Sequence, residues 1–156
     1  MSYRISGLSP DPFRHLFLMT DVELAAHRAQ RFIAGPNSGM PDRIELRDAR
    51  EGETVVLVNY EHHAVQTPFR ASHAIFVLEH AHAAAVVENK VPDVMRTRLL
   101  SLRAFTADGM MVDADVVDGT EAETLIAKLF EVPEVEYLHA HYARRGCYAA
   151  LIERAS

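Results

Sequence analysis

Leu99-Leu-Ser-Leu-Arg-Ala-Phe-Thr-Ala-Asp-Gly-Met-Met-Val-Asp-Ala-Asp-Val-Val117 is the stretch that indicates the fold class most directly. Asp108-Gly109 lies between two strand-like runs, 99–107 and 110–117, and this dipeptide is preferred in two-residue hairpin loops. We therefore expect a tight turn at Asp108-Gly109 and antiparallel pairing of the two runs.

Further strands are expected on both sides of this hairpin, over residues 3–7, 30–34, 43–47, 54–62, 74–78, 136–143 and 147–153. Helix signals are fewer, and they lie at Ser9-Pro10-Asp11-Pro12 and in two capping boxes, Thr20–Glu23 and Thr120–Glu123. The helix after the second box should end by Val132 and bury one apolar stripe: Ala122, Leu125, Ile126, Leu129 and Phe130. Because strands outnumber helices, we predict a single α+β domain over residues 1–156, a mostly antiparallel β-sheet with a few short helices packed on it.

Composition excludes several classes of protein. The chain has 156 residues with 16 basic and 22 acidic side chains, and the net charge of −6 provides no basic surface for nucleic acid or anionic membranes. Cys147 is the only cysteine, so an intrachain disulfide and a Cys-rich zinc module are both excluded. The N-terminal residues do not form a secretory signal, and no apolar run is long enough for a membrane helix, so we expect a cytoplasmic protein. The composition identifies no cofactor and leaves a homo-oligomer open.

Polar chemistry is concentrated in the closing hairpin, Tyr137-Leu-His-Ala-His-Tyr-Ala-Arg-Arg-Gly-Cys-Tyr148. Side chains alternate along a strand, so His139 and His141 should share one face while Leu138, Ala140 and Tyr142 take the other. A three-residue loop over 144–146 would pair residue 143 with Cys147 and bring the thiol to the histidine face. A tighter turn would move Cys147 to the Tyr142 face.

Two imidazoles and a thiol on one face can bind a soft divalent metal, or can serve as acid/base group and nucleophile. We therefore treat His139, His141 and Cys147 as candidate catalytic residues. The alternative is structural, because His pairs on strands are often bonded to carbonyls and a lone Cys is usually a small buried hydrophobe.

Four further residues are candidates for ligand binding. Arg70 and Arg144 could hold an anion, since the guanidinium fork matches carboxylate and phosphate, and Asn59 and Tyr60 end an apolar strand with polar side chains. Solvated arginines and an ordinary strand end are the alternatives. The leading hypothesis is a protein that binds or transforms a small polar or anionic molecule near the closing hairpin. The competing hypothesis is a non-catalytic interaction or dimerisation domain that uses a sheet face or edge.

Several segments in the same order resemble one bacterial family, catalogued only as a domain of unknown function, number twelve hundred and three. The segments are Asn59–His62, Thr67–Val77, Leu100–Phe105, Asp108–Asp115 and His139–Cys147. The resemblance covers nearly the whole chain and implies a stand-alone domain of about this length, with no activity, cofactor or substrate to carry over. The family pattern often has Pro where this chain has Arg145, which favours the tighter turn, so the face of Cys147 stays open.

Overall fold

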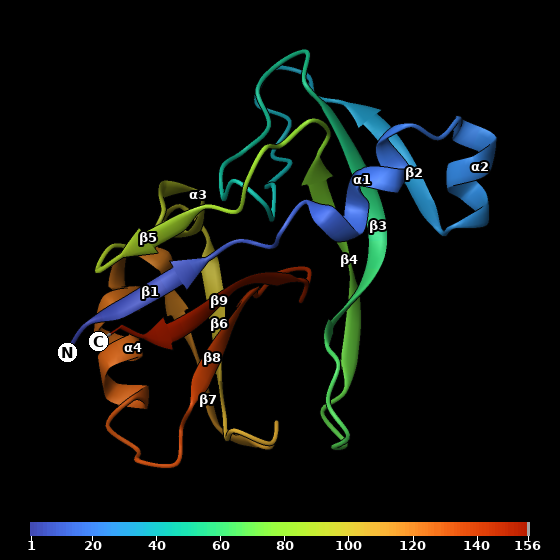
Figure 1. Ribbon diagram of the computed structural model, residues 1–156. Coiled ribbons are helices and arrows are strands. Elements are labelled where there is room, and N and C mark those ends of the chain that lie inside the picture. Colours follow the sequence, from blue (N-terminus) through green and yellow to red (C-terminus); the bar gives the residue numbers. More distant parts are fainter. Residues whose placement is uncertain (156) are drawn as a thin grey trace.

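Two antiparallel sheets form the framework of the computed structural model, which describes residues 1–155 (Figure 1). The six-stranded sheet has the order β5 (Val86–Glu88), β1 (Tyr3–Ser6), β9 (Tyr148–Arg154), β8 (Tyr137–Tyr142), β6 (Leu99–Phe105) and β7 (Met111–Asp118). The three-stranded sheet has the order β2 (Ala29–Ile33), β3 (Thr54–His63) and β4 (Ala71–Leu78). The α+β class with mainly antiparallel strands is therefore confirmed.

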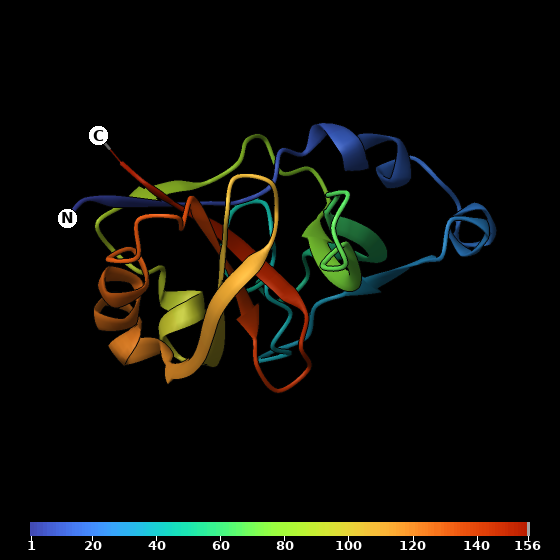
Figure 2. The same cartoon turned by 90° about the horizontal axis from the view of Figure 1, so that it is seen from below.

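Short helices cover these sheets from outside. Helices α3 (Asp93–Arg96) and α4 (Ala122–Leu129) lie on one face of the six-stranded sheet, and the β3–β4 hairpin lies beside the other face (Figure 2). Helices α1 (Arg14–Phe17) and α2 (Asp21–Ala26) belong to the three-stranded side, and 3-10 turns η1 (Asp11–Phe13) and η2 (Gly119–Glu121) precede α1 and α4. In the described part of the chain no helix combines the length and apolar character needed to cross a membrane.

Each sheet has its own hydrophobic core. The first core lies between the six-stranded sheet and α3 and α4, and it includes Leu102, Leu138 and the predicted α4 stripe of Ala122, Leu125, Ile126, Leu129 and Phe130, all buried. The second core joins the three-stranded sheet to α1 and α2 and includes Phe13, Leu24, Val56 and Ile75. Between the two cores, rings of the three-stranded sheet contact rings of the six-stranded sheet, as His62 does with His139 and Tyr148 and His63 does with Phe105.

The β6–β7 hairpin pairs as predicted, but its loop is longer than two residues. The Thr106 N–H donates to the Met110 carbonyl at 2.9 Å, and the Gly109 N–H donates to the Thr106 carbonyl at 3.0 Å. The loop therefore contains Ala107, Asp108 and Gly109, with Gly109 at φ +93°. A glycine at positive φ that closes a three-residue loop is one of the standard hairpin solutions, so the antiparallel pairing is confirmed and the two-residue turn is wrong.

Two other local predictions are wrong. Residues 43–47 do not form a strand, because Leu46 has φ +54° and the Asp42 carboxylate accepts the N–H groups of Glu45 and Leu78.

The predicted side-chain cap does not form at the start of α4, because the chain enters this helix through η2. Glu123 pairs with Arg96 at 3.0 Å instead. The capping box at Thr20–Glu23, in contrast, is present with both of its hydrogen bonds.

Gly119 supports the contact between η2 and α3, and we predict that Gly119→Ala destabilises the protein. A Cβ at this position would overlap the Met95 carbonyl oxygen and lie 2.7 Å from the Arg96 Cα, both backbone atoms. Such overpacking costs about 1–3 kcal/mol in the free energy of unfolding. The control is Gly35→Ala, where a Cβ meets nothing within 4 Å, and it should change stability by less than about 0.5 kcal/mol. Equal urea midpoints for the two variants would contradict the packing described.

Candidate functional site

A β-bulge near the end of β3 determines which side chains face the six-stranded sheet. Tyr60 pairs with His73 and His63 pairs with Ala71, so two residues of β3, Glu61 and His62, lie opposite one residue of β4. In a regular strand His62 and His63 would point to opposite faces. Here both rings contact His139, with centroid distances of 5.8 Å for His62 and 4.9 Å for His63.

Strand β8 supplies the other side of the contact. His139 and His141 leave the same face of β8, while Leu138, Ala140 and Tyr142 enter the first core, so the predicted division of faces is confirmed. Both imidazoles are buried, at 5% and 1% exposure, and they meet rings from β3 and β4. Five rings form this histidine cluster: His62, His63, His73, His139 and His141.

Hydrogen bonds fix some of these rings and leave others without partners. His63 is satisfied at both nitrogens, by the Phe69 carbonyl at 2.8 Å and the Tyr137 hydroxyl at 2.6 Å. His141 donates from Nδ1 to the Gly146 carbonyl at 2.9 Å. His62 Nε2 and His73 Nδ1 are joined by a hydrogen bond of 2.8 Å, and the centroids of the two stacked rings lie 4.9 Å apart. The Nδ1 atoms of His62 and His139 are buried and have no hydrogen-bond partner among residues 1–155.

Burial keeps His62, His139 and His141 neutral. Desolvation, together with the neighbouring histidines and Arg103, lowers the pKa of His139 to about 2, that of His141 to about 3 and that of His62 to about 4. Desolvation also lowers the pKa of His73, which is only partly buried. At neutral pH His62, His139 and His141 therefore present uncharged rings with lone pairs available to a proton donor or a metal ion.

Cys147 lies on the other face of the hairpin. The Tyr142 N–H donates to the Cys147 carbonyl at 2.9 Å and the Gly146 N–H donates to the Tyr142 carbonyl at 2.8 Å, so residues 143–146 form a four-residue loop. The register shifts by one residue, with Ala140 opposite Ala150 and His141 opposite Tyr148. The predicted three-residue loop is therefore wrong, and the thiol does not join His139 and His141.

An arginine cleft lies at this end of the hairpin. Its volume is about 880 Å³, and its wall includes Cys147, His73, Asp118 and five arginines: Arg43, Arg96, Arg98, Arg144 and Arg145. Arg43 is 1% exposed, and its guanidinium donates to the carbonyls of Tyr148 (2.8 Å) and Pro41 (2.5 Å) and to the Cys147 Sγ (3.0 Å). Arg144 therefore lines this cleft together with Cys147.

The remaining sequence candidates lie elsewhere. Arg70 is exposed and its guanidinium pairs with Glu61 at 2.9 Å. Asn59 lines a smaller cavity of about 250 Å³ beside β2, and the Tyr60 ring packs on Phe13 at 5.1 Å. These three residues are therefore neither in the arginine cleft nor in the histidine cluster.

Sequence reasoning missed His62, His63 and His73 as neighbours of His139 and His141, and it missed Arg43 as the buried charge behind Cys147. Two adjacent histidines at the end of a strand were the available signal for His62 and His63. Both histidines contact residues of β8 that lie more than seventy positions later in the sequence, so only the packing of the two sheets reveals these contacts.

Comparison with known proteins identifies a family without an assigned activity. A family model described as "Protein of unknown function (DUF1203)" matches residues 39–154. No curated protein and no solved structure matches the chain.

Acidification is predicted to destabilise the folded protein. Below about pH 6.5 the unfolded chain takes up protons on His62, His139 and His141, whereas the folded state holds them neutral, so the free energy of unfolding falls as the pH falls. Each group contributes a slope of at most about 1.4 kcal/mol per pH unit. Urea unfolding from about pH 7.5 down to about pH 5 measures the effect.

The exposed His80 provides the control for this titration. His80→Ala removes an imidazole that is 81% exposed and lies outside the histidine cluster, so this variant should still lose stability on acidification, because the buried rings are intact. If the free energy of unfolding of the wild type stays constant from about pH 7.5 to about pH 5, the buried rings titrate as they do in the unfolded chain, and the prediction is contradicted.

Proposed function

The chain belongs to the DUF1203 family, and we propose that it binds a small anionic molecule in the arginine cleft at its closing hairpin. One observation carries the proposal: three arginines of the cleft wall have no carboxylate partner in the described part of the chain. Arg144 and Arg145 are exposed on the loop, and Arg43 is buried behind them. The only acidic side chain in that wall is Asp118.

The charge of the cleft opposes that of the whole protein. The chain carries a net charge of −6, yet five arginines gather around one cavity. Two of them are already neutralised, because Arg96 pairs with Glu123 at 3.0 Å and Arg98 pairs with Asp48 at 2.8 Å. The positive potential that remains comes from Arg43, Arg144 and Arg145, and it is available to an incoming anion.

Arg43 is the strongest single indication. A buried guanidinium without an ion-pair partner is costly, and two carbonyl oxygens, a sulfur atom and the charge of the neighbouring Asp42 supply only part of the interaction that a directly bonded carboxylate or phosphate would give. Its contact with the Cys147 Sγ places the thiol at the cleft wall. The volume of about 880 Å³ suits a ligand of metabolite size.

The competing function, dimerisation through a sheet edge, has less support. Strand β7 is the edge of the six-stranded sheet, and Val112 and Val116 are exposed there. However, the Asp113 and Asp115 carboxylates accept the N–H groups of Ala114 and Val116, each at 2.8 Å. Charged side chains that cover edge N–H groups disfavour pairing with another strand.

Inorganic phosphate and citrate are suitable probes of the cleft. We expect both to raise the melting temperature at low ionic strength, and we expect Arg144→Ala/Arg145→Ala to weaken citrate binding by about tenfold or more, measured by isothermal titration calorimetry. The control variant is Arg14→Ala/Arg50→Ala, which removes the same charge from two exposed positions outside the cleft. Equal weakening in both variants would mean that net charge alone governs binding, and a wild-type protein that binds neither probe would refute the proposal.

Cys147 should report occupancy of the same cleft. We expect iodoacetamide to alkylate it in the folded protein at neutral pH, because the thiol is only partly buried and lines an open cavity. Saturating citrate should slow the reaction several-fold, as followed by intact-protein mass spectrometry. Labelling that begins only when urea unfolds the chain would place the thiol out of reach of any ligand in the cleft.

A further inference from the structure

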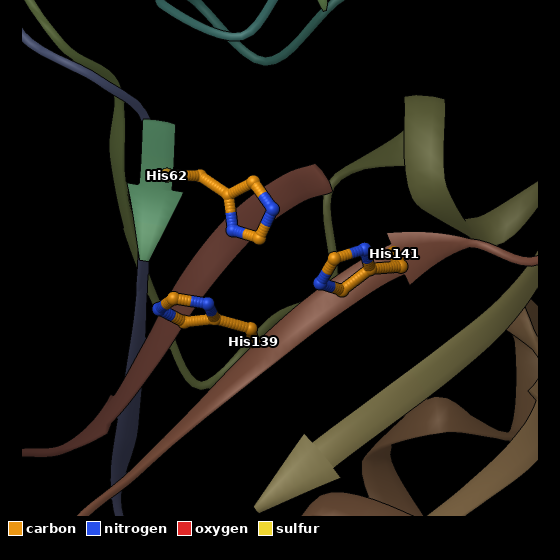
Figure 3. A group of neighbouring side chains, drawn as sticks. All are labelled: His62, His139 and His141. Atoms are coloured by element: carbon orange, nitrogen blue, oxygen red, sulfur yellow. The ribbon is translucent and has the colours of Figure 1, made fainter. Parts of the chain in front are cut away.

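Three rings of the histidine cluster turn nitrogens toward one common point. One nitrogen each from His62, His139 and His141 can be chosen so that all three lie within 4.8 Å of one another. Figure 3 shows His62 entering this space from one side and His139 and His141 from the other, with nitrogens of all three rings facing inward. The three come from β3 and β8, so the space exists only where the two sheets meet.

Two of these nitrogens lack the partner that a buried polar atom requires. Only three buried side-chain nitrogens or oxygens in residues 1–155 have no hydrogen bond, and two of them are the Nδ1 atoms of His62 and His139. An unsatisfied buried group costs about 1–3 kcal/mol, and native proteins rarely tolerate two at one place without a bound species. His141 uses Nδ1 for the Gly146 carbonyl, which leaves its Nε2 with a lone pair.

We propose that His62, His139 and His141 bind one divalent transition-metal ion between the two sheets, with a fourth coordination position left open. Zinc–nitrogen bonds of about 2.0–2.1 Å place the nitrogens of a tetrahedral site about 3.3 Å apart, so the rings close by at most about 1.5 Å when the ion enters. Three protein ligands with an open position are the arrangement that catalytic zinc sites use.

The surroundings orient the ligands as metal sites require. Metal-bound histidines usually donate their other N–H to a carbonyl or a polar side chain, which fixes the tautomer. His141 donates its Nδ1–H to the Gly146 carbonyl. When His62 donates its Nε2–H to His73 Nδ1, its own Nδ1 keeps a lone pair that can bind the metal. His73 is thus a positioning residue, and it also lines the arginine cleft.

The ligand set selects the class of metal. Three neutral imidazoles suit Zn²⁺, Co²⁺, Ni²⁺ and Cu²⁺, whereas Mg²⁺ and Ca²⁺ require oxygen ligands. No carboxylate is bonded to these rings in residues 1–155, and Cys147 faces Arg43 instead. Arg103 pairs with His139 across the β6–β8 ladder and adds positive charge. The open position should therefore hold hydroxide or another anion, which lowers the net charge of the buried ion.

This inference goes beyond the proposed function and does not depend on it. The arginine cleft lies beside the histidine cluster, and His73 is the residue that belongs to both. A protein that binds citrate without metal, or metal without citrate, would separate the two proposals.

The test uses the full chain without an affinity tag, stripped with EDTA and titrated with Co²⁺. We expect one ion per chain by elemental analysis and the intense visible absorption of four-coordinate Co²⁺, which Zn²⁺ then displaces. His139→Gln and His62→Gln should abolish the absorption. His73→Ala should retain it but weaken affinity by about 10–100-fold, as loss of an outer partner does.

Matched controls separate this site from surface binding and from the cleft. His80 and His82 form the other His-x-His pair of the chain, and both are exposed. His80→Ala/His82→Ala should bind Co²⁺ as the wild type does, and so should Arg144→Ala/Arg145→Ala. Circular dichroism establishes whether each glutamine variant is folded.

Two results would overturn the metal site. The first is a wild-type protein that retains no Co²⁺ after desalting or shows only the weak spectrum of six-coordinate Co²⁺, and this result requires no variant to fold. The second is binding that disappears in His80→Ala/His82→Ala but persists in His139→Gln.

Discussion

The bulge at Glu61–His62 turns two consecutive histidines of β3 toward the six-stranded sheet, and the arrangement of the site depends on it. Without the extra residue, His62 and His63 would alternate, and only one of them could face β8. With it, His63 bonds the Tyr137 hydroxyl while His62 reaches His139 and His141. The junction between the two sheets is consequently lined with imidazoles at a place where aliphatic packing would serve stability better.

The closing hairpin separates two kinds of chemistry by the alternation of its side chains. One face of β8 carries neutral, buried histidines, and beyond the hairpin's end Arg43 donates to Cys147 beside the exposed arginines of the loop. The histidine cluster suits a cation with imidazole ligands, whereas the arginine cleft suits an anion. His73 links them, since it bonds His62 and also lines the cleft.

Local patterns predicted most of the fold because they report interactions between residues that are close in sequence. Asp108-Gly109 indicated the β6–β7 hairpin, and the apolar spacing of Leu125, Ile126 and Leu129 indicated the buried stripe of α4. The errors arose where distant contacts override local preference. Asp42 binds backbone groups of the following segment and of β4, which prevents a strand over 43–47, and a bulge in β9 moves Cys147 to the Tyr142 face. The shared face of His139 and His141 followed from strand alternation alone, whereas the meeting of His62 with them depends on how the two sheets pack.

The central claim is that His62, His139 and His141 are neutral at physiological pH and point their lone pairs at one another. A long-range ¹H–¹⁵N correlation spectrum of the imidazole rings tests this most directly, because it distinguishes neutral tautomers from the cation. The structure predicts three neutral rings at about pH 7, with His141 protonated at Nδ1, and none of the three should titrate above about pH 5. Three rings that titrate together near pH 6.5, as solvated histidines do, would contradict the account.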